Sequence, residues 1–565
     1  MTGNTVPELV DRQAAVTPEA IALRHPGGTL TYAALKARSD ELARALAALG
    51  VRRETPVALE VPRGAEAVVL MLAVLKCGGF YVPLDPGHPA AHRERVIAGS
   101  GAWLVLTGTA DLDSIVDTAT PESPLPGSAA YLVHTSGSTG EPKGVVATHE
   151  AVVNLVTEPA LGIEPGDRVL QYAPLAFDAA TFEIWGALTR GGTLAIAPPG
   201  ALGTGDLLEF LEWAQISVAW LTAGLFHELV TAEKRLPGGL RLLFAGGDTV
   251  RADVVRQAAA LAPGTRLVNG YGPTECTTFT TLQPGLGELA ADGRTTMPIG
   301  RPLAGVTAHV LDDKLVPVPD GEIGQLYVSG VNLARGYHDR PGATATRFVA
   351  GPDGTRRYRT GDLVRRLPGG ALEFCGRADR QVKVRGFRVE PGELEACLGA
   401  HPEVRAAAAL GVPDQAGGAR LLAYVVPETG EVDLTALRAW LAERVPAYLV
   451  PSSLLQLPAL PLSPNGKVDT AALPVPGEPV TDAGPAPVTP AEKLVAETWQ
   501  AVLGVDAVGM DDNFFELGGD SLRMNRVAAE LRRATGLRIA LADLLLAETA
   551  GELASSLEDR SLQER

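Results

Sequence analysis

The stretch YLVHTSGSTGEPKG, residues 131–144, joins an apolar run to a turn rich in glycine, hydroxyl side chains and one lysine. A glycine-rich turn directly after a buried strand is typical of open α/β sheets, which bind ligands at the carboxyl ends of their strands. The composition of the turn favours a loop that holds phosphate, although the same composition also occurs in ordinary surface loops. The stretch therefore predicts an α/β fold with a phosphate-binding loop at a sheet edge.

The same succession of strand and turn recurs through about residue 375. Short β-branched runs alternate there with Ala/Leu-rich stretches of helical spacing. This alternation predicts a layered α/β body of parallel sheets and helices over residues 1–375. The runs typical of buried strands are residues 168–174, 192–198, 218–223 and 241–247, and the helical stretches are residues 207–215 and 253–261.

Three further segments follow the α/β body. Residues 376–472 open with the charge-rich GRADRQVKVRGFRVEPGELEA and continue with a smaller α+β pattern. Residues 473–489 are rich in proline and alanine, which predicts an extended, semi-rigid linker. Residues 490–565 have the amphipathic spacing of three or four helices, so we expect a separate small bundle.

Composition limits the class of protein. A chain of 565 residues is too long for one core and predicts three or four compact units. The formal charge of −17 disfavours nucleic acid or an anionic membrane as a partner, because polyanions would be repelled. With no signal-peptide pattern and no apolar run long enough to span a bilayer, the sequence predicts a cytoplasmic protein. The four widely separated cysteines predict buried small side chains rather than a metal or redox site.

The turn TSGSTGEPKG is not a Walker loop. A Walker loop has the pattern GxxxxGK[ST], whereas Lys143 follows Glu-Pro and precedes Gly-Val-Val. Pro142 also removes one backbone amide donor. A flexible loop of hydroxyl-bearing residues can nevertheless close over the β- and γ-phosphates, with Lys143 as a point charge.

Two other turns carry side chains suited to a nucleotide. In NGYGPTE an exposed Tyr271 can stack on a purine, Thr274 can donate to a phosphate oxygen, and Glu275 can hold Mg²⁺. In YRTGDL the carboxylate of Asp362 can accept from two ribose hydroxyls. Two structural alternatives stay open, since Tyr271 could pack in the core and Asp362 could cap a turn.

In order and nearly throughout, the chain resembles the adenylation domains of nonribosomal peptide synthetases, members of the adenylate-forming superfamily. The resemblance is carried by LTYAAL, LKCGGFYVPLDP, YLVHTSGSTGEPKGV, FDAATFEIW, NGYGPTE, GQLYVSG, ARGY, YRTGDL, GRADRQVKVRGFRVE and LSPNGKVD. It implies an enzyme that activates an amino acid with ATP and Mg²⁺, in which TSGSTGEPKG orients the departing pyrophosphate. The residues that it assigns to the nucleotide are Thr135, Ser136, Gly137, Ser138, Thr139, Gly140, Lys143, Gly246, Asn269, Tyr271, Thr274 and Asp362, with Glu275 as the metal ligand.

The resemblance also assigns roles to residues of the small subdomain. Lys467 in LSPNGKVD matches the lysine that bridges the substrate carboxylate and the nucleotide. Arg377 and Asp379 in GRAD lie where the two subdomains meet, and Asp379 matches the hinge about which the small subdomain swings. After the swing, the loop VKVRGFR would face the site, with Gly386 leaving room for a pantetheine arm. The alternative is that GRADRQ forms a salt-bridged surface turn.

The last segment resembles a thiolation, or peptidyl carrier, domain. In DNFFELGGDSL, the resemblance implies that a separate phosphopantetheinyl transferase attaches 4′-phosphopantetheine to Ser521. The thiol of this arm would attack the adenylate and give an aminoacyl thioester. The structural alternative is that Asp520 or Ser521 only caps a helix.

The substrate is predicted from the residues that match the family's specificity positions. Asp178 in FDAATFEIW would pair with the α-ammonium group of an amino acid, whereas aryl-acid-activating relatives usually carry asparagine. The matched set is close to the valine pattern, and a methyl group at Ala245 would trim the pocket toward 2-aminobutyrate. The expected pocket walls are Ala179, Phe182, Trp220, Leu243, Ala245, Gly270, Thr278 and Phe279, completed by Lys467.

The sequence thus favours a free-standing loading didomain that passes its aminoacyl thioester to a downstream tailoring or condensation enzyme. A small MbtH-like helper protein is a further candidate partner. Two other functions stay open: an acyl- or aryl-CoA ligase, which would share the fold, and a catalytically inactive scaffold that only carries Ser521. Asp178, the valine-like walls and the attached carrier argue against the ligase, and the intact Lys143, Glu275, Asp362 and Lys467 argue against the inactive scaffold.

Overall fold

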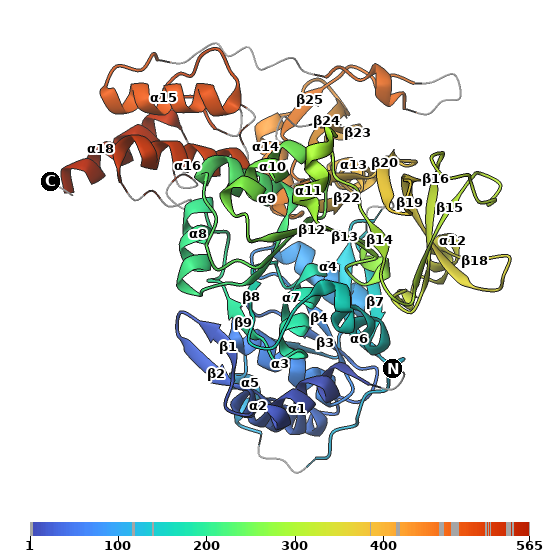
Figure 1. Ribbon diagram of the computed structural model, residues 1–565. Helices are drawn as coiled ribbons and strands as arrows, with labels where there is room; N and C mark the ends of the chain where they lie inside the picture. The colour runs from blue at the N-terminus through green and yellow to red at the C-terminus, as the bar shows by residue number, and fades with distance from the viewer. Residues whose placement is uncertain are drawn as a thin grey trace.

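The computed structural model describes most of the chain, and its element labels are those of Figure 1. The described residues are 4–115, 119–137, 141–384, 386–413, 419–462, 468–475, 485–514, 517, 519, 521–537, 539, 544, 547 and 549–563. In these residues no helix is both long and apolar enough to cross a membrane.

A nine-stranded sheet forms one layer of the large N-terminal body. Its order is β14-β13-β12-β11-β10-β8-β9-β1-β2, and β12, β11, β10, β8 and β9 run parallel. The predicted parallel strands and the helices between them are therefore confirmed. The strands are β1 (Ile21–His25), β2 (Gly28–Thr31), β8 (Arg168–Gln171), β9 (Thr193–Ile196), β10 (Val218–Thr222), β11 (Leu242–Gly246), β12 (Arg266–Tyr271), β13 (Thr281–Pro284) and β14 (Arg301–Pro302).

A six-stranded sheet of order β17-β7-β6-β4-β3-β5 forms a second layer. The core between the two sheets includes helices α3 (Ala65–Lys76) and α7 (Ala179–Leu188), and every residue of α7 is buried. A helix that is apolar on every side can only be stable when it is covered on every side. The strands are β3 (Pro56–Leu59), β4 (Phe80–Pro83), β5 (Leu104–Leu106), β6 (Ala129–Thr135), β7 (Lys143–Thr148) and β17 (Gly336–Tyr337).

The remaining helices of the large body cover these two sheets and their edges (Figure 1). Several begin at a threonine whose hydroxyl accepts a backbone N–H, as Thr31, Thr148 and Thr222 do. The helices are α1 (Val6–Val16), α2 (Tyr32–Ala48), α4 (Ala90–Ser100), α5 (Ala110–Asp113), α6 (His149–Thr157), α8 (Thr204–Trp213), α9 (Ala223–Glu228), α10 (Ala252–Leu261), α11 (Leu286–Leu289) and α12 (Pro341–Arg347).

A five-stranded antiparallel sheet completes the large body and leads into the small subdomain. Its strands pair in the order β15-β16-β19-β18, and β20 pairs with β19. β20 runs two residues past residue 375, where the sequence predicts the boundary. The strands are β15 (Val306–Leu311), β16 (Ile323–Gly330), β18 (Phe348–Ala350), β19 (Arg356–Arg366) and β20 (Leu372–Arg377).

The small subdomain has the predicted α+β composition. A three-stranded sheet, β23-β24-β25, packs with two helices around its own apolar core, and a two-stranded hairpin, β21-β22, precedes it. The elements are β21 (Val382–Val384), β22 (Phe387–Val389), α13 (Pro391–Gly399), β23 (Val404–Pro413), β24 (Ala419–Pro427), α14 (Leu434–Ala442) and β25 (Ser453–Gln456).

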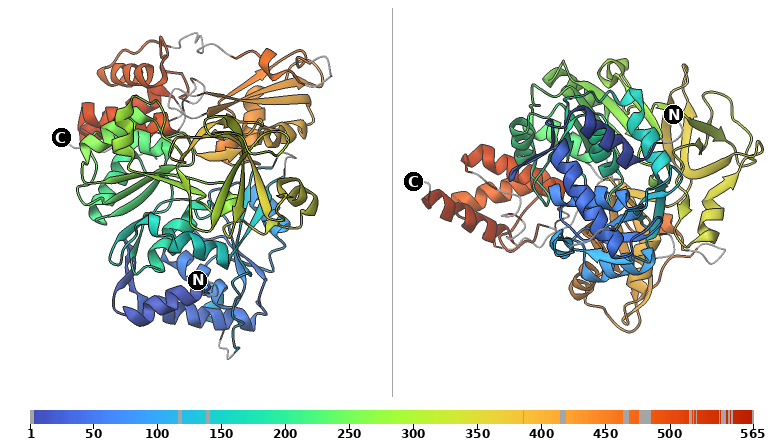
Figure 2. Two further views of the ribbon diagram at one scale, coloured as in Figure 1. Left: turned by 45° about the vertical axis from the view of Figure 1, so that its right-hand side comes forward. Right: turned by 90° about the horizontal axis from the view of Figure 1, so that it is seen from below.

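The C-terminal bundle has a separate core, as the sequence predicts. Its described helices are α15 (Pro490–Leu503), α16 (Ser521–Thr535) and α18 (Ala550–Gln563), and they pack around Trp499, Val527 and Leu553. Thr489 and Glu492 cap α15 reciprocally. The bundle protrudes from one side of the body, and α16 contacts α8 and α9 (Figure 2).

Candidate active site

The carboxyl ends of β10, β11 and β12 meet at one edge of the nine-stranded sheet. The register pairs Thr222 with Gly246 and Gly246 with Gly270, so the three strands end side by side. The turns that follow them line a cavity closed by α7 and by the hairpin β21-β22. Its lining includes Phe177, Asp178, Ala179, Trp220, Gly247, Gly270, Tyr271, Thr274, Thr278, Phe279, Asp362, Arg377, Lys383, Gly386 and Arg388.

Asp178 places a buried carboxylate in this cavity. It precedes the first turn of α7, and only 8% of its surface is exposed. Burial raises its pKa to about 6, although the side chain of Thr274 hydrogen-bonds to it. Asp178 forms no ion pair with any residue that the structure describes, so its carboxylate can accept a cationic group of a ligand.

Aromatic rings fill the space behind the cavity wall. The ring of Phe182 lies 5.1 Å from that of Phe244 and 5.2 Å from that of Phe279, measured between centroids. Trp220, from the neighbouring strand, is 5% exposed and lines the cavity beside Gly247. The floor is therefore apolar and crowded: Trp220 and Phe279 line the cavity, and the ring of Phe182 packs against that of Phe279.

Two predicted pocket walls are wrong. Leu243 and Ala245 belong to the core on the other side of the sheet, where they pack with residues of α8 and α10. Phe244 lies on the cavity side, because successive residues of a strand point to opposite faces and the predicted alignment is shifted by one position. A Cβ on the next cavity-side residue, Gly246, would lie 2.1 Å from the carbonyl oxygen of Gly270.

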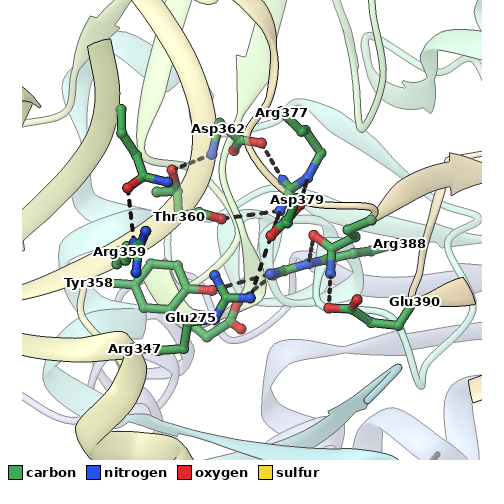
Figure 3. A network of polar contacts seen from close by, with 12 residues as sticks. Glu275, Arg347, Tyr358, Arg359, Thr360, Asp362, Arg377, Asp379, Arg388 and Glu390 are labelled. Carbon is green, nitrogen blue, oxygen red and sulfur yellow. Dashed lines mark hydrogen bonds and ion pairs between the residues drawn. The ribbon is translucent and has the colours of Figure 1, made fainter. Parts of the chain in front are cut away.

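Glu275 forms the centre of a charged network between the two subdomains (Figure 3). Its Oε2 accepts from Nη1 of Arg388 on β22 at 2.6 Å, and its Oε1 accepts from the hydroxyl of Tyr337 at 2.6 Å. Burial alone would raise the pKa of Glu275, but the charge of Arg388 and the tyrosine hydroxyls lower it. The predicted Mg²⁺ ligand is thus neutralised here by a guanidinium of the small subdomain.

Asp362 joins the strand β19 to the predicted hinge. One oxygen pairs with Arg377 and the other accepts from the hydroxyl of Tyr271. Arg377 also donates to Asp379 through Nε at 2.7 Å and Nη2 at 3.0 Å. Arg377 therefore links the buried Asp362 to Asp379, whose side chain is 28% exposed, so GRAD is a salt-bridged segment only partly shielded from solvent (Figure 3). A side chain at Gly361 would put its Cβ 2.6 Å from Oδ2 of Asp379.

The prediction that Tyr271 is exposed is wrong. The side chain is 6% exposed, its hydroxyl bonds to Asp362, and the ammonium group of Lys383 lies 5.7 Å from the ring centroid. Sequence alone could not show this burial, because β19 and the hairpin that cover Tyr271 lie about a hundred residues away. Asn269 faces away from the cavity, and its amide donates to the carbonyl of Pro298 at 2.8 Å.

The phosphate-loop residues contact the small subdomain. Ser136 donates to the carbonyl of Arg388 at 2.7 Å and accepts from the amide of Glu390 at 3.1 Å. Gly137 donates to Glu393, whose pKa burial raises to about 7. Thr135 ends β6, and Lys143 begins β7 with its pKa lowered by burial. The predicted residues Ser138, Thr139 and Gly140 lie outside the described residues.

The hairpin β21-β22 lines the cavity through Lys383, Gly386 and Arg388. Gly386 at its turn has a φ of 83°, and a Cβ there would lie 2.8 Å from Cγ2 of Thr222. Lys467 lies outside the described residues. Ser521 is the first residue of α16, and the structure does not describe its side chain.

Sequence reasoning missed three features of the site. Phe244 was hidden by the one-residue shift, and the contact of Arg388 with Glu275 depends on how the two subdomains meet. Thr277 and Thr278 adopt left-handed backbone angles, with φ of 53° and 69°. Hydrogen bonds from their hydroxyls to the carbonyls of Asn332 and Asp178 hold this strained turn.

Three family models match successive parts of the chain. They are described as AMP-binding enzyme for residues 10–338, AMP-binding enzyme C-terminal domain for residues 393–467, and phosphopantetheine attachment site for residues 493–557. The first alone covers more than half of the chain.

Curated relatives and solved structures agree with these models. A linear gramicidin synthase protein of Brevibacillus parabrevis is 43% identical over 94% of this chain, and phosphinothricin tripeptide synthetase PhsC of Streptomyces viridochromogenes is 40% identical over 99%. The chain spans only 7% and 53% of their respective lengths. A solved holo NRPS protein containing adenylation and PCP domains, bound to a vinylsulfonamide inhibitor, is similar with a TM-score of 0.86 and 30% identity, covering 99% of this chain and 97% of that one.

The order of the three matches is the order of the layered α/β body, the α+β subdomain and the helical bundle. The buried carboxylates of Glu275 and Asp362, paired with Arg388 and Arg377 respectively, lie where the first two of these parts meet. The chain belongs to the AMP-binding enzyme family, and it combines an adenylation domain with the carrier domain of nonribosomal peptide synthetases.

Proposed function

We propose that the chain activates a small aliphatic amino acid, valine or 2-aminobutyrate, as its adenylate and then loads it on the carrier domain. The observation that carries this proposal is the carboxylate of Asp178, buried above an aromatic floor with no ion-pair partner among the described residues. An α-ammonium group would neutralise it, and the rings of Phe244 and Phe279 would leave space for only a short apolar side chain.

In the first half-reaction a carboxylate oxygen of the amino acid attacks the α-phosphorus of ATP. The bond from that phosphorus to the β-phosphate oxygen breaks, and pyrophosphate leaves. Asp178 would hold the ammonium end of the amino acid, and Asp362 and Lys467 would orient the ribose and the reacting carboxylate. A carboxylate suits Mg²⁺, and Glu275 would hold the ion, which supplies positive charge against the phosphates.

In the second half-reaction the aminoacyl group leaves AMP and becomes a thioester. Phosphopantetheine on Ser521, attached by a separate transferase, would supply the thiol. We assign the present arrangement to this half-reaction, because the hairpin β21-β22 lines the cavity through Lys383, Gly386 and Arg388. Asp379 would be the hinge for the return, which must separate Arg388 from Glu275 before the ion can bind.

Only the aromatic floor limits the size of the substrate side chain. The methyl group of Ala245 lies across the sheet and has no effect on the cavity. Valine and 2-aminobutyrate differ by one methylene, which an apolar pocket distinguishes by about 10–200-fold at most. Both substrates therefore remain part of the proposal.

ATP–pyrophosphate exchange across a panel of amino acids tests the first half-reaction. Valine or 2-aminobutyrate should give the highest kcat/KM, and a preference for a charged or aromatic amino acid would refute the pocket. Lys467→Ala should lower exchange by about 100-fold. Lys314→Ala, on an exposed turn, is the matched control.

Intact-mass spectrometry tests the second half-reaction. The phosphopantetheinylated protein with ATP and valine should gain the mass of one aminoacyl group. Ser521→Ala should abolish this gain and leave exchange unchanged. The same experiment would show whether downstream tailoring or condensation enzymes, or an MbtH-like protein, change the loaded fraction; we propose these as partners.

A further inference from the structure

A basic face of helix α16 lies against the large body. Nε of Arg526 donates to Oε2 of Glu228 at 2.7 Å, and Nη2 of the same guanidinium bonds to Oε1. Nη2 of Arg533 donates to the carbonyl of Ala232 at 3.0 Å. Figure 1 shows α16 beside α8 and α9, which agrees with these contacts.

The sequence of α16 separates this face from the face that folds the bundle. Met524, Val527 and Leu531 are buried in the core of the bundle. Arg526 and Arg533 are seven residues apart, which is two helical turns, so their side chains project on the same side. The arginines can therefore change without removing a core residue of the carrier.

The surface that receives α16 is fixed directly to the cavity. Glu228 is the last residue of α9, and α9 starts at the end of β10, next to Thr222 beside the hairpin turn. Beyond Glu228 the chain forms a π-helical segment, Leu229–Glu233, which presents the carbonyl of Ala232 to Arg533. Such π-helical turns occur frequently at functional sites.

Glu228 is an unusual residue for a surface that only touches another domain. It is 1% exposed, and its two carboxylate oxygens both bond to Arg526. A planar guanidinium fits two carboxylate oxygens at once, whereas an ammonium group offers only a point charge. An acidic residue in place of Arg526 would bring two carboxylates together in a site with little water.

Gly205 on α8 leaves room for a further arginine of α16. A Cβ at Gly205 would lie 2.4 Å from Nη1 of Arg532. The acceptor surface thus fits this helix in shape and in charge.

We propose that the Glu228–Arg526 pair selects the carrier domain and positions it for loading. The large body accepts a carrier with arginine at the fifth position after its modified serine and rejects one with an acidic residue there. This inference rests on the proposed function, because it concerns the thioester-forming half-reaction. Both are positioning residues, since neither lines the cavity.

The test uses the full phosphopantetheinylated chain and the amino acid that gives the fastest exchange. Single-turnover loading is followed by rapid quenching and intact-mass spectrometry. Arg526→Glu should slow loading at least about tenfold, because a hydrogen-bonded charge pair is replaced by repulsion. Arg526→Lys should be intermediate. Lys493→Glu, the same charge change on the exposed side of α15, should load at the rate of the unchanged protein.

The charge-swapped double variant separates docking from folding. Glu228→Arg should load as slowly as Arg526→Glu, and the double variant should recover to within about threefold of the unchanged protein. If Glu228→Arg disturbs the fold of the large body, ATP–pyrophosphate exchange will fall. The loading rate of Arg526→Glu alone then tests the proposal. Loading of Arg526→Glu at the normal rate would overturn the proposal. So would a double variant that has normal exchange but loads as slowly as the single variants.

Salt dependence gives a readout that a purely structural role would not change. Loading by the unchanged protein should slow as sodium chloride rises from about 0.05 to about 0.5 M, whereas loading by Arg526→Glu should not slow further, because salt screens the repulsion between the two carboxylates. A loading rate independent of salt would contradict an electrostatic selection step. Absence of exchange with every amino acid would instead refute the proposed function.

Discussion

Two buried carboxylates of the site differ in their partners. Glu275 is paired with Arg388, and its pKa is lowered. Asp178 has no ion-pair partner among the described residues, and burial raises its pKa to about 6. A charge buried without a partner is costly, and a ligand cation removes that cost. At the scale of single residues, this difference is why we propose Asp178, and not Glu275, as the carboxylate that receives the substrate.

Replacing Asp178 tests this assignment. Asp178→Asn should raise the KM for the amino acid by about 30-fold or more in ATP–pyrophosphate exchange, with little change in the KM for ATP. In the unchanged protein the same KM should rise as pH falls through about 6, because protonation removes the carboxylate that the ammonium needs. Asp313→Asn, on an exposed turn, is the control. A KM that stays flat between about pH 7 and 5 would contradict the role of Asp178.

At the scale of elements, the strand β11 shows what sequence could predict and what it could not. Its position, direction and apolar character follow from RLLFAGG, and the structure confirms them. A shift of one residue in the alignment changes which face of the strand points to the cavity. An apolar sequence does not show the correct alignment, because Leu243, Phe244 and Ala245 are all suited to a buried strand. The contacts of Arg388 could not be predicted from the sequence either, because they depend on how the two subdomains meet.

The register of β11 predicts a contrast between neighbouring substitutions. Phe244→Ala should open the cavity floor, so that leucine or phenylalanine gains at least about tenfold in relative kcat/KM over valine. Leu243→Ala should leave this ratio unchanged and lower only stability, by about 2–5 kcal/mol. Exchange assays and thermal unfolding of both variants provide the measurement. The opposite pattern would restore the predicted register.

The hairpin β21-β22 makes a prediction for the second half-reaction. Gly386→Ala would place a methyl group 2.8 Å from Thr222 at a φ that disfavours side chains, so the hairpin should seat poorly. We expect loading to slow about tenfold and exchange to persist, in the assay by intact mass. Gly399→Ala, where the added atom meets nothing within 4 Å, is the matched control. Equal loading by the two variants would exclude a tight fit at the hairpin turn.

At the scale of the whole molecule, three parts with separate apolar cores follow one another along the chain. The sequence was sufficient for the order and fold of the parts, because each contains its own periodic pattern and motifs. The contacts between them, such as Ser136 with Glu390 and Glu228 with Arg526, could not be predicted, because each joins residues far apart in the chain.

The pair of Arg388 with Glu275 predicts how the arrangement responds to substitution. Arg388→Met would leave Glu275 buried without its guanidinium and destabilise the present arrangement by about 3 kcal/mol. Loading should therefore slow by at least about tenfold, whereas exchange should persist. Arg405→Met on the exposed surface of β23 is the control. Loading of Arg388→Met at the normal rate would show that the pair does not hold this arrangement together.

The same pair has a consequence for how the molecule responds to its surroundings. If Glu275 pairs with Arg388 in one subdomain arrangement and with Mg²⁺ in the other, its carboxylate is neutralised in both. The two arrangements can then have similar free energies. The concentration of magnesium nucleotide would then control how much of the protein is in each arrangement. A high concentration of magnesium nucleotide would favour the arrangement that forms the adenylate, and a low concentration would favour the arrangement that forms the thioester.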